Sequence, residues 1–197
     1  MRKLVYYIGT SVDGYIAGPA GEVDFYPVGD AEQAAAYAAA VNARYPETVP
    51  TAMRAHAGLA DAPNLRFDTV LMGSGTYRPA LEHGMPSPYA HLRQYVVSST
   101  LGPSPDPAVT VVGGDPLALV RDLKRQEGPE GLDIWLCGGG RLAAALLPEI
   151  DELIVKSYPV VAGAGIPLFG GEFDPKRFRV RARESFANEV MITWFEA

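Results

Sequence analysis

The sequence predicts an α/β protein whose central sheet is mostly parallel, with antiparallel strands at one edge. Three observations lead to this prediction. Short apolar runs rich in β-branched and aromatic residues alternate with segments of helical propensity, which is the pattern of strand–helix–strand units. The last two runs are separated by a three-residue turn, as in an antiparallel hairpin. The 197 residues, 48% of them hydrophobic, suit one globular domain with a substantial core.

The expected elements follow one another along the chain. A buried strand at 3–9 precedes a loop at 10–21, in which glycines and a proline interrupt any regular pattern. Further strands are expected at 67–72, 94–98, 109–112, 133–137 and 152–157, and a hairpin at 178–186 and 190–195. Helices are expected at 31–44 after the cap Asp30, at 52–59, at 75–83, from the cap Asp115 to Gln126, and at 140–147.

The segment at about 26–66 is the least regular part of the chain. It contains the alanine-rich helix, and prolines break the pattern after that helix. We expect this segment to be an insertion or a lid within a single domain that covers residues 1–197.

Charge and composition disfavour several classes of function. A net charge of −6 without a basic run disfavours nucleic acid as a partner. No apolar stretch approaches the roughly 20 residues that span a bilayer, so we expect a cytoplasmic chain without membrane contact. The single cysteine, Cys137, excludes an intramolecular disulfide and is expected to be a buried thiol. The three histidines are scattered without metal-ligand spacing, so no metal site is predicted.

A run of three glycines at 138–140 is the clearest functional signal. An apolar strand ends there and a helix begins at once, in the sequence DIWLCGGGRLAAALL. Glycines let a ligand approach the backbone, and the first amides of a helix have no partner within the helix. Such amides, together with the helix dipole and the adjacent Arg141, favour a phosphate or pyrophosphate. The alternative is a tight strand-to-helix turn without a ligand.

Five short motifs occur in the order typical of one family of reductases. They are TSVDGYIA at 10–17, VLMGSGTY at 70–77, YVVSST at 95–100, IWLCGGGRL at 134–142 and PVVAGAGIPLF at 159–169. Together they resemble the dihydrofolate-reductase-like family, and within it the reductase domain of bacterial riboflavin-biosynthesis deaminase-reductases. The resemblance implies a three-layer fold with a mixed sheet of about eight strands, a homodimer, and NADPH as hydride donor.

The same resemblance assigns cofactor-binding positions along the chain. Ile16 and Ala17 would lie along the nicotinamide, while the serine pair at a strand end would contact the adenosine portion. Two helix starts would meet the phosphates. The remaining cofactor-binding residues implied in this way are Gly73, Ser74, Gly75, Thr76, Ser98, Ser99, Gly138, Gly139, Gly140, Arg141 and Leu142.

Ser74 departs from the family pattern. Relatives carry an arginine at this position, and that cation helps to hold the 2′-phosphate of NADPH. A serine does not replace the charge-assisted, bidentate contact of an arginine. NADPH remains the expected cofactor, with weaker binding, NADH use, or supply of the cation by Arg78 or another residue as alternatives.

Asp13 is the candidate catalytic acid. It lies in the loop beside the expected nicotinamide site, where relatives of the riboflavin branch keep an acid. The alternative is a turn aspartate before Gly14 that caps its own loop. The helix at 31–44 lacks a carboxylate that aligns with the pterin-binding acid of true dihydrofolate reductases, so folate reduction is not expected.

The expected function is hydride transfer from NAD(P)H to a small heterocyclic substrate. The nearest family activity is reduction of 5-amino-6-(5-phosphoribosylamino)uracil in riboflavin biosynthesis. The alternative is a non-catalytic nucleotide-binding or sensing module on the same fold.

Overall fold

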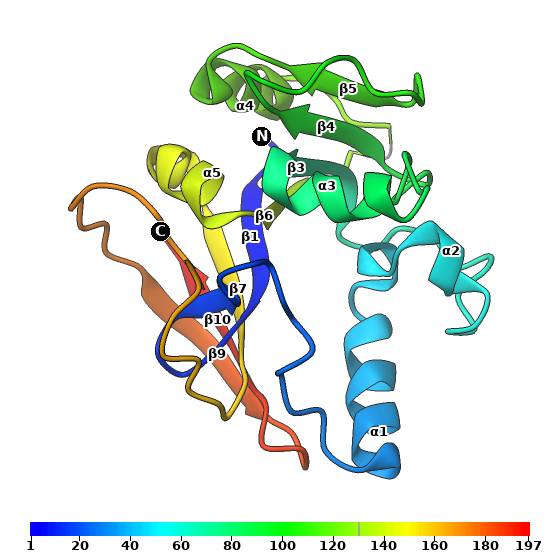
Figure 1. Ribbon diagram of the computed structural model, residues 1–197, viewed down its shortest axis with the longest axis vertical. Coiled ribbons are helices and arrows are strands. Elements are labelled where there is room, and N and C mark those ends of the chain that lie inside the picture. The colour runs from blue at the N-terminus through cyan, green and yellow to red at the C-terminus, as the bar shows by residue number, and fades with distance from the viewer. Residues whose placement is uncertain (130) are drawn as a thin grey trace.

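An eight-stranded sheet runs through the centre of the computed structural model, which describes residues 1–129 and 131–197 (Figure 1). Its strand order is β5-β4-β3-β6-β1-β7-β10-β9. The first six strands in this order are parallel, whereas β10 is antiparallel to β7 and to β9. The strands are β1 Leu4–Thr10, β3 Phe67–Gly73, β4 Arg93–Val97, β5 Val109–Val112, β6 Asp133–Gly138, β7 Glu152–Ser157, β9 Arg179–Ser185 and β10 Met191–Glu196. The predicted mixed sheet with a C-terminal hairpin is confirmed.

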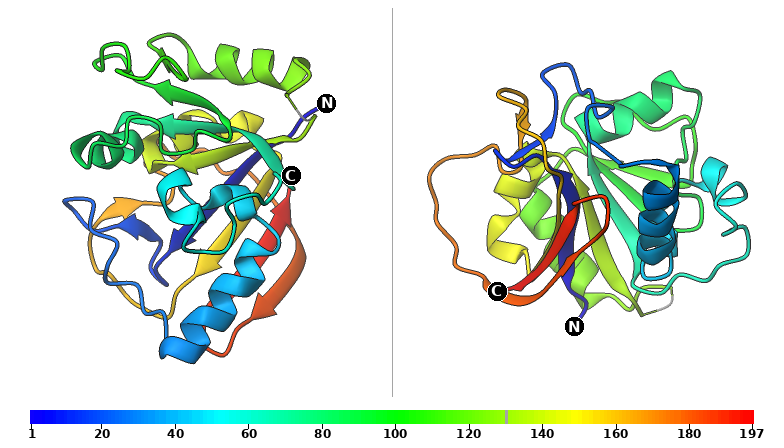
Figure 2. Two further views of the ribbon diagram at one scale, coloured as in Figure 1. Left: turned by 90° about the vertical axis from the view of Figure 1, so that its right-hand side faces the viewer. Right: turned by 90° about the horizontal axis from the view of Figure 1, so that it is seen from below.

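Helices cover both faces of the sheet and give the predicted three layers. One face carries α1 (Ala31–Asn42) and α3 (Ser74–Glu82), and the other carries α4 (Pro116–Arg125) and α5 (Gly140–Ala145). Figures 1 and 2 show α1 and α5 on opposite sides of the sheet. Each face has its own apolar core, and alternate residues of the strands supply the two cores because strand side chains alternate in direction.

The caps predicted for two helices form as expected. Asp30 and Gln33 make a reciprocal capping box at the start of α1, with N–O distances of 2.9 and 3.0 Å. The Asp115 carboxylate accepts a 2.9 Å hydrogen bond from the Leu117 amide at the start of α4. The predicted helix at 140–147 ends earlier, at Ala145, and a 3₁₀ turn at Leu147–Glu149 follows because Pro148 lacks an amide hydrogen.

The segment at 26–66 is fixed to the rest of the molecule after α1. Tyr45 packs into the core, and a 3₁₀ turn (Pro46–Thr48) and the short α2 (Thr51–Arg54) follow. The fully buried Glu47 carboxylate accepts hydrogen bonds from the amides that lead into β3, at 2.8 to 3.3 Å. These contacts hold the second half of the segment against the start of β3.

The loop predicted at 10–21 contains a strand that the sequence did not reveal. Here β2 (Tyr15–Ala17) pairs antiparallel with β8 (Ile166–Pro167) in a second, two-stranded sheet. Gly165 permits this pairing, because a Cβ atom there would collide with the carbonyl oxygen of Ala17. Both segments are rich in glycine and show no strand pattern in their own sequence. Their pairing depends on contact between parts of the chain that are far apart in sequence.

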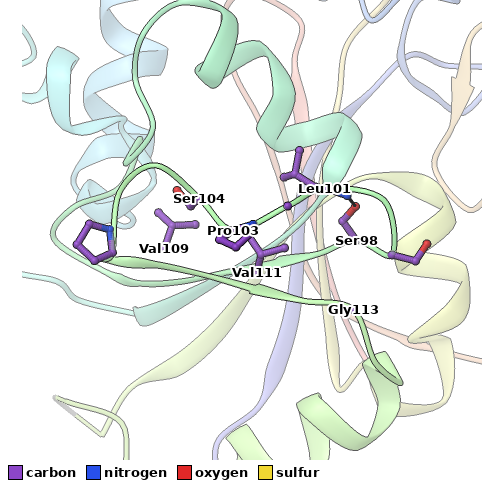
Figure 3. Close-up of a pocket in the computed structure, with 10 residues that line it drawn as sticks. Ser98, Leu101, Pro103, Ser104, Val109, Val111 and Gly113 are labelled. Carbon is purple, nitrogen blue, oxygen red and sulfur yellow. Dashed lines mark hydrogen bonds between the residues drawn. The ribbon is translucent and has the colours of Figure 1, made fainter.

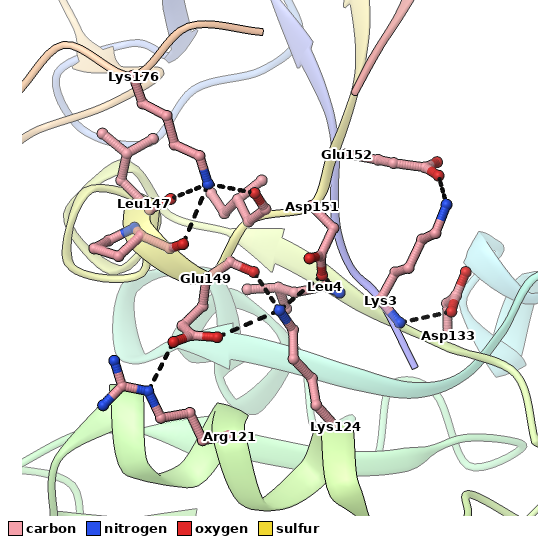
Figure 4. Close-up of polar contacts among 12 residues, drawn as sticks. Lys3, Leu4, Arg121, Lys124, Asp133, Leu147, Glu149, Asp151, Glu152 and Lys176 are labelled. Atoms are coloured by element: carbon pink, nitrogen blue, oxygen red, sulfur yellow. Dashed lines mark hydrogen bonds and ion pairs between the residues drawn. The ribbon is translucent and has the colours of Figure 1, made fainter. Parts of the chain in front are cut away.

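Ion pairs link neighbouring segments at the edge of the sheet where the parallel strands begin. Lys3 pairs with Glu152 at 2.5 Å, and Lys124 pairs with Asp151 at 2.7 Å (Figure 4). Lys176 donates to three backbone carbonyls that follow α5, those of Leu147, Pro148 and Ile150. The opposite, carboxyl edge carries the glycine loops.

Within the described residues, no helix is long and apolar enough to cross a membrane.

Candidate functional site

The glycine loop and the start of α3 meet at the carboxyl edge of the sheet. They follow β6 and β3, which are neighbours. The helices after these two strands lie on opposite faces, since α3 packs in one core and α5 in the other. In open α/β sheets such a divergence leaves a crevice at the carboxyl ends of the strands, and ligands bind there. The topology therefore places the two predicted phosphate-binding segments side by side.

Thr76 is the side chain that the glycine loop faces. Cβ atoms added at Gly138 and Gly139 would lie 3.3 and 3.5 Å from its Oγ1 atom. Gly138 has a φ of 136°, which side-chain-bearing residues rarely adopt. Gly139 caps α5 without a side-chain hydrogen bond, so the first amides of α5 have no acceptor from the cap. This arrangement leaves backbone donors beside a hydroxyl, a suitable environment for an anion.

At Gly140, close packing against β8 is what requires a glycine. A Cβ atom there would collide with the carbonyl oxygen of Pro167 in β8. The amide of Gly170 also donates to the Gly140 carbonyl at 3.0 Å. The third glycine thus lets β8 pack against the start of α5, whereas the first two face Thr76.

The small sheet brings the predicted nicotinamide side next to the glycine loop. Pro167 pairs with Tyr15 in β2, while its carbonyl contacts Gly140. Ala17 is buried and Ile16 is half-buried in this strand. The Leu168 amide adds a 2.8 Å hydrogen bond to the carbonyl of Gly14. Ile16 and Ala17 thus lie in a strand that β8 ties directly to the glycine loop.

Ser74 and Gly75 occupy the first positions of α3. Gly73 caps this helix without a side-chain hydrogen bond, and a Cβ atom added there would lie 3.4 Å from the Gly139 amide nitrogen. Gly75 is exposed, and a Cβ atom there would meet open space. Ser74 is half-buried. The start of α3 is therefore open to a ligand at Gly75 and adjoins the glycine loop at Gly73.

A cavity of about 390 Å³ lies beyond β4, at the predicted adenosine side. Figure 3 shows Ser98 and Leu101 at one end of it and Ser104 and Val109 at the other. The Ser98 hydroxyl accepts hydrogen bonds from the Thr100 and Leu101 amides, at 3.2 and 3.0 Å. Ser98 therefore shapes the turn, while the exposed Ser99 lines the cavity without such a bond.

Arg141 and Leu142 lie in α5, with Arg141 exposed and Leu142 buried in the core.

A second cavity, of about 260 Å³, lies on the α1 and α3 side of the sheet. Thr76 lines it, so this cavity adjoins the glycine loop. Its other lining residues include Met72, Tyr89 and Cys137. Burial raises the pKa of the Cys137 thiol to about 12, so Cys137 is a neutral thiol at pH 7. The expected buried thiol is only half-buried, because Cys137 lines this cavity, whose wall is largely apolar.

Asp13 lies at the exposed tip of the loop between β1 and β2. Its carboxylate accepts hydrogen bonds from the Ser11 hydroxyl and from the amides of Ala162 and Gly163, at 2.7, 3.0 and 2.7 Å. These bonds, that of Ser11 first, lower the pKa of Asp13 to about 2. An ionised carboxylate with three donors is an acceptor and holds no proton to give. The Ser11 bond is that of a turn aspartate capping its own loop, whereas the two amides belong to the loop after β7.

Lys156 is a polar residue of this region that received no role from the sequence. It lies near the end of β7, and its Nζ atom is 4.3 Å from the ring centroid of Tyr7. The sequence signal was present, because Lys156 is two residues after the buried Ile154 and so shares its face of the strand.

Among the described residues, no three His, Cys, Asp or Glu side chains gather as a metal site.

A family model described as the RibD C-terminal domain matches residues 2–192. The chain belongs to this family. Two curated relatives from Bacillus subtilis (strain 168) are similar to it along much of their length. The uncharacterized protein YwjB is 28% identical over 198 residues, covering 100% of this chain and 99% of its own. The uncharacterized protein YyaP is 28% identical over 183 residues, covering 85% and 80%.

Solved structures share the fold of this RibD C-terminal domain. A putative riboflavin biosynthesis protein from Shewanella sp. PV-4 has a TM-score of 0.67 and 25% identity, covering 100% of this chain and 98% of its own. A pyrimidine reductase-like protein from Corynebacterium diphtheriae has a TM-score of 0.58 and 15% identity, covering 99% and 91%. A diaminohydroxyphosphoribosylaminopyrimidine deaminase/5-amino-6-(5-phosphoribosylamino)uracil reductase from Thermotoga maritima has a TM-score of 0.61 and 13% identity, covering 99% of this chain and 56% of its own. The predicted family is confirmed, and it includes reductases.

Proposed function

We propose that this RibD C-terminal domain is an NAD(P)H-dependent reductase that acts on a small heterocyclic substrate. One observation carries the proposal: three segments expected along a dinucleotide adjoin one another at the carboxyl edge of the sheet. They are β2, the start of α3 and the glycine loop, joined by the contacts of β8 and Thr76. The bound cofactor would supply a hydride, and the protein would supply position and electrostatics.

The chain offers a suitable contact for each part of the dinucleotide. The amides after Gly139, with the exposed Arg141 beside them, suit the pyrophosphate. The cavity at Ser99 suits the adenosine portion, and β2 lies where the nicotinamide is expected. A side chain at Gly138 or Gly139 would fill the space against Thr76, which explains why the loop has none there.

NADPH is the proposed donor, although Ser74 changes how its 2′-phosphate would be held. The serine hydroxyl and the open backbone at Gly75 offer neutral donors in place of a guanidinium. The exposed Arg78, one turn along α3, is the cation nearest in sequence to these positions. NADH is the alternative donor, because it lacks the 2′-phosphate.

The substrate is proposed to occupy the apolar cavity beside Thr76. Its volume of about 260 Å³ and its lining suit one flat ring system better than a highly charged molecule. The nearest family activity, reduction of 5-amino-6-(5-phosphoribosylamino)uracil, acts on a compound of this kind. Asp13 is proposed to position the loops beside the nicotinamide, since its carboxylate already binds two amides of the loop after β7.

A nucleotide-binding or sensing module without turnover is the second candidate. The ionised state of Asp13 favours it, because the acid expected to donate a proton has a pKa of about 2. The apolar cavity next to the glycine loop favours the reductase, because a nucleotide sensor has no need of a second, substrate-sized space there.

An isotope-transfer experiment separates the two candidates. The purified protein is incubated with NADPH deuterated at the transferring position and with a panel of pyrimidine and pteridine carbonyl or imine compounds. The reductase should place deuterium on one of these compounds, detected by mass spectrometry, with matching loss of NADPH absorbance. Nucleotide binding without transfer to any compound would favour the sensing module.

A further inference from the structure

Lys156 differs from the other lysines of the chain in having no anionic or carbonyl partner among the residues that the structure describes. The sequence contains four lysines. Lys3 and Lys124 form ion pairs, and Lys176 donates to backbone carbonyls, all at the opposite edge of the sheet (Figure 4). In the part of the chain that the structure describes, Lys156 forms neither an ion pair nor a hydrogen bond, and its ammonium lies over the face of the Tyr7 ring. An ammonium with three donors is therefore left available.

The groups around this ammonium are neutral. Tyr7 lies beneath it in β1, and Cys137 and Tyr158 lie near it. From β10, the residue paired with Lys156 is Ile192. Glu184 in β9 is paired in turn with Ile192, and Arg44, just after α1, already binds that carboxylate at 2.5 and 3.1 Å. No carboxylate of the described residues neutralises Lys156.

Lys156 lies on the same side of the sheet as the proposed substrate cavity. In β1, Tyr7 and Gly9 point to this side, and Gly9 is paired with Lys156. Cys137 at the end of β6 lines the cavity and also lies near Lys156. Gly9 has no side chain, and the ring of Tyr158 and the stem of Lys156 lie over it.

Aromatic side chains gather around Tyr158, whose ring lies over Gly9 together with the Lys156 stem. The Tyr37 hydroxyl of α1 lies 3.4 Å from that of Tyr158, and the Tyr26 ring packs on Tyr158 with a centroid distance of 4.6 Å. These rings offer flat, apolar surfaces and hydroxyl groups, but no further charge. A ligand that enters here meets one cation and several ring faces.

We propose that the Lys156 ammonium binds an anionic or carbonyl oxygen of a planar heterocycle, and that this contact selects the substrate of the reductase. This proposal rests on the proposed function, because it takes the bound heterocycle to be the substrate of the reductase. A single ammonium matches one oxygen with one negative charge. A phosphate dianion is normally held by several donors, such as arginine forks and clustered amides, which this side of the sheet does not offer around Lys156.

The lowered pKa of Lys156 is consistent with a ligand-binding role. Burial lowers the pKa of Lys156, because the surrounding protein solvates the ammonium less well than water does. An anionic oxygen would relieve that cost, so binding of the right ligand should raise the pKa of Lys156 again.

The test uses barbiturate as a planar monoanionic probe, uracil as its neutral counterpart, and inorganic phosphate. Calorimetry gives Kd values for the wild-type protein, for Lys156→Met and for the control Lys3→Met. The Cε signals of the four lysines, labelled with ¹³C, are followed in the wild-type protein, with Lys156→Met assigning one of them. We expect barbiturate to bind about tenfold more tightly than uracil and to shift the Lys156 signal.

In Lys156→Met the preference for barbiturate should disappear, while Lys3→Met should retain it. Failure of barbiturate to bind, equal binding of barbiturate and uracil, an unmoved Lys156 signal, or a stronger effect of phosphate would each overturn the proposal. If Lys156→Met does not fold, Lys156→Arg removes the same lysine signal and assigns it, so the wild-type signals still give this answer. A parallel NADPH titration tests the proposed function separately, because barbiturate binding does not depend on the nucleotide.

Discussion

The Asp13 carboxylate accepts a 2.7 Å hydrogen bond from the backbone amide of Gly163 and so joins the loop after β1 to the loop after β7. These residues are 150 positions apart in sequence. The loop that contains Gly163 leads directly into β8, which pairs with β2 and contacts Gly140. One carboxylate therefore helps to hold the strand that connects the nicotinamide side to the glycine loop.

Replacement of Asp13 by asparagine should weaken nucleotide binding rather than abolish a proton-transfer step. The variant loses the negative charge that strengthens three hydrogen bonds, so we expect Kd for NADPH to rise about fivefold. Nicotinamide fluorescence measures this change, with Asp61→Asn, an exposed position, as the control. A nucleotide Kd equal to that of the wild-type protein would show that the loop contact has no part in binding.

The pH dependence of Asp13 follows from the direction of its pKa shift. Folding lowers this pKa from 3.8 to about 2, so the carboxylate stabilises the fold fully above about pH 4 and loses that effect as the pH falls through about 2. Nucleotide affinity should therefore show no Asp13-dependent step between about pH 5 and pH 8. A step in that range that is present in the wild-type protein and absent in Asp13→Asn would contradict this account.

Adjacent glycines of the loop should respond differently to alanine. Gly140→Ala places a Cβ atom against the Pro167 carbonyl and should lower the free energy of unfolding by about 2 kcal/mol. Gly139→Ala places its Cβ atom 3.5 Å from the Thr76 hydroxyl, so the fold should tolerate it while nucleotide binding weakens. Urea unfolding and NADPH titration measure the two effects, and equal loss of stability in both variants would contradict the assignment.

Introduction of an arginine at Ser74 should increase the preference for NADPH over NADH. Ser74 begins α3 and is half-exposed, so the longer side chain can extend into solvent without displacing core residues. A guanidinium near a 2′-phosphate should lower Kd for NADPH about tenfold and leave that for NADH nearly unchanged. Arg78→Ala in the wild-type background tests whether that cation now fills this role. Equal changes for both nucleotides in Ser74→Arg would place the 2′-phosphate elsewhere.

Removal of the Lys156 charge should stabilise the fold. Lys156→Met keeps the apolar stem near Tyr7 and removes an unpaired ammonium, so the free energy of unfolding should rise by about 1 kcal/mol at pH 7. Because folding lowers the pKa of Lys156, the unfolded chain binds more protons, and wild-type stability should rise with pH up to about 10.5. The advantage of Lys156→Met should shrink over that range. Denaturation curves at several pH values test this, and a less stable variant at pH 7 would contradict it.

Glu47 should contribute strongly to stability through its three amide hydrogen bonds. Glu47→Ala leaves the amides before β3 without their buried acceptor, which should lower the free energy of unfolding by about 3 kcal/mol. Glu32→Ala, at an exposed position of α1, is the matched control and should change stability by less than about 0.5 kcal/mol. Unfolding curves that coincide for the two variants would show that the segment after α1 is not fixed through Glu47.

Most strands and helices were predictable because their patterns are local. The alternation of apolar residues gives β5 its observed bounds, and Asp30 and Asp115 cap helices as polar N-cap residues do. The pairing of β2 with β8 was not predictable, because it depends on Gly165 and on contacts between segments about 150 residues apart. The position of α2 was predicted only approximately, as prolines and glycines leave little periodic signal there.

Sequence reasoning also had limits at the candidate site. The three glycines formed one motif in the sequence, yet Gly140 faces β8 while the other two face Thr76. Asp13 was identified by its position in a motif, but its partners, Ala162 and Gly163, come from another part of the chain. Lys156 was overlooked because a lysine at the end of a strand is normally exposed, and its lack of a partner is visible only in three dimensions.

Titration of the purified protein with NADPH and NADH, followed by nicotinamide fluorescence, tests the central claim most directly. The wild-type protein should bind at least one of the two nucleotides, NADPH the more tightly. Gly139→Val should abolish that binding while circular dichroism shows a folded chain, because its side chain would occupy the space between the loop and Thr76. Failure of the wild-type protein to bind either nucleotide at about millimolar concentration, or unchanged binding by Gly139→Val, would contradict the account.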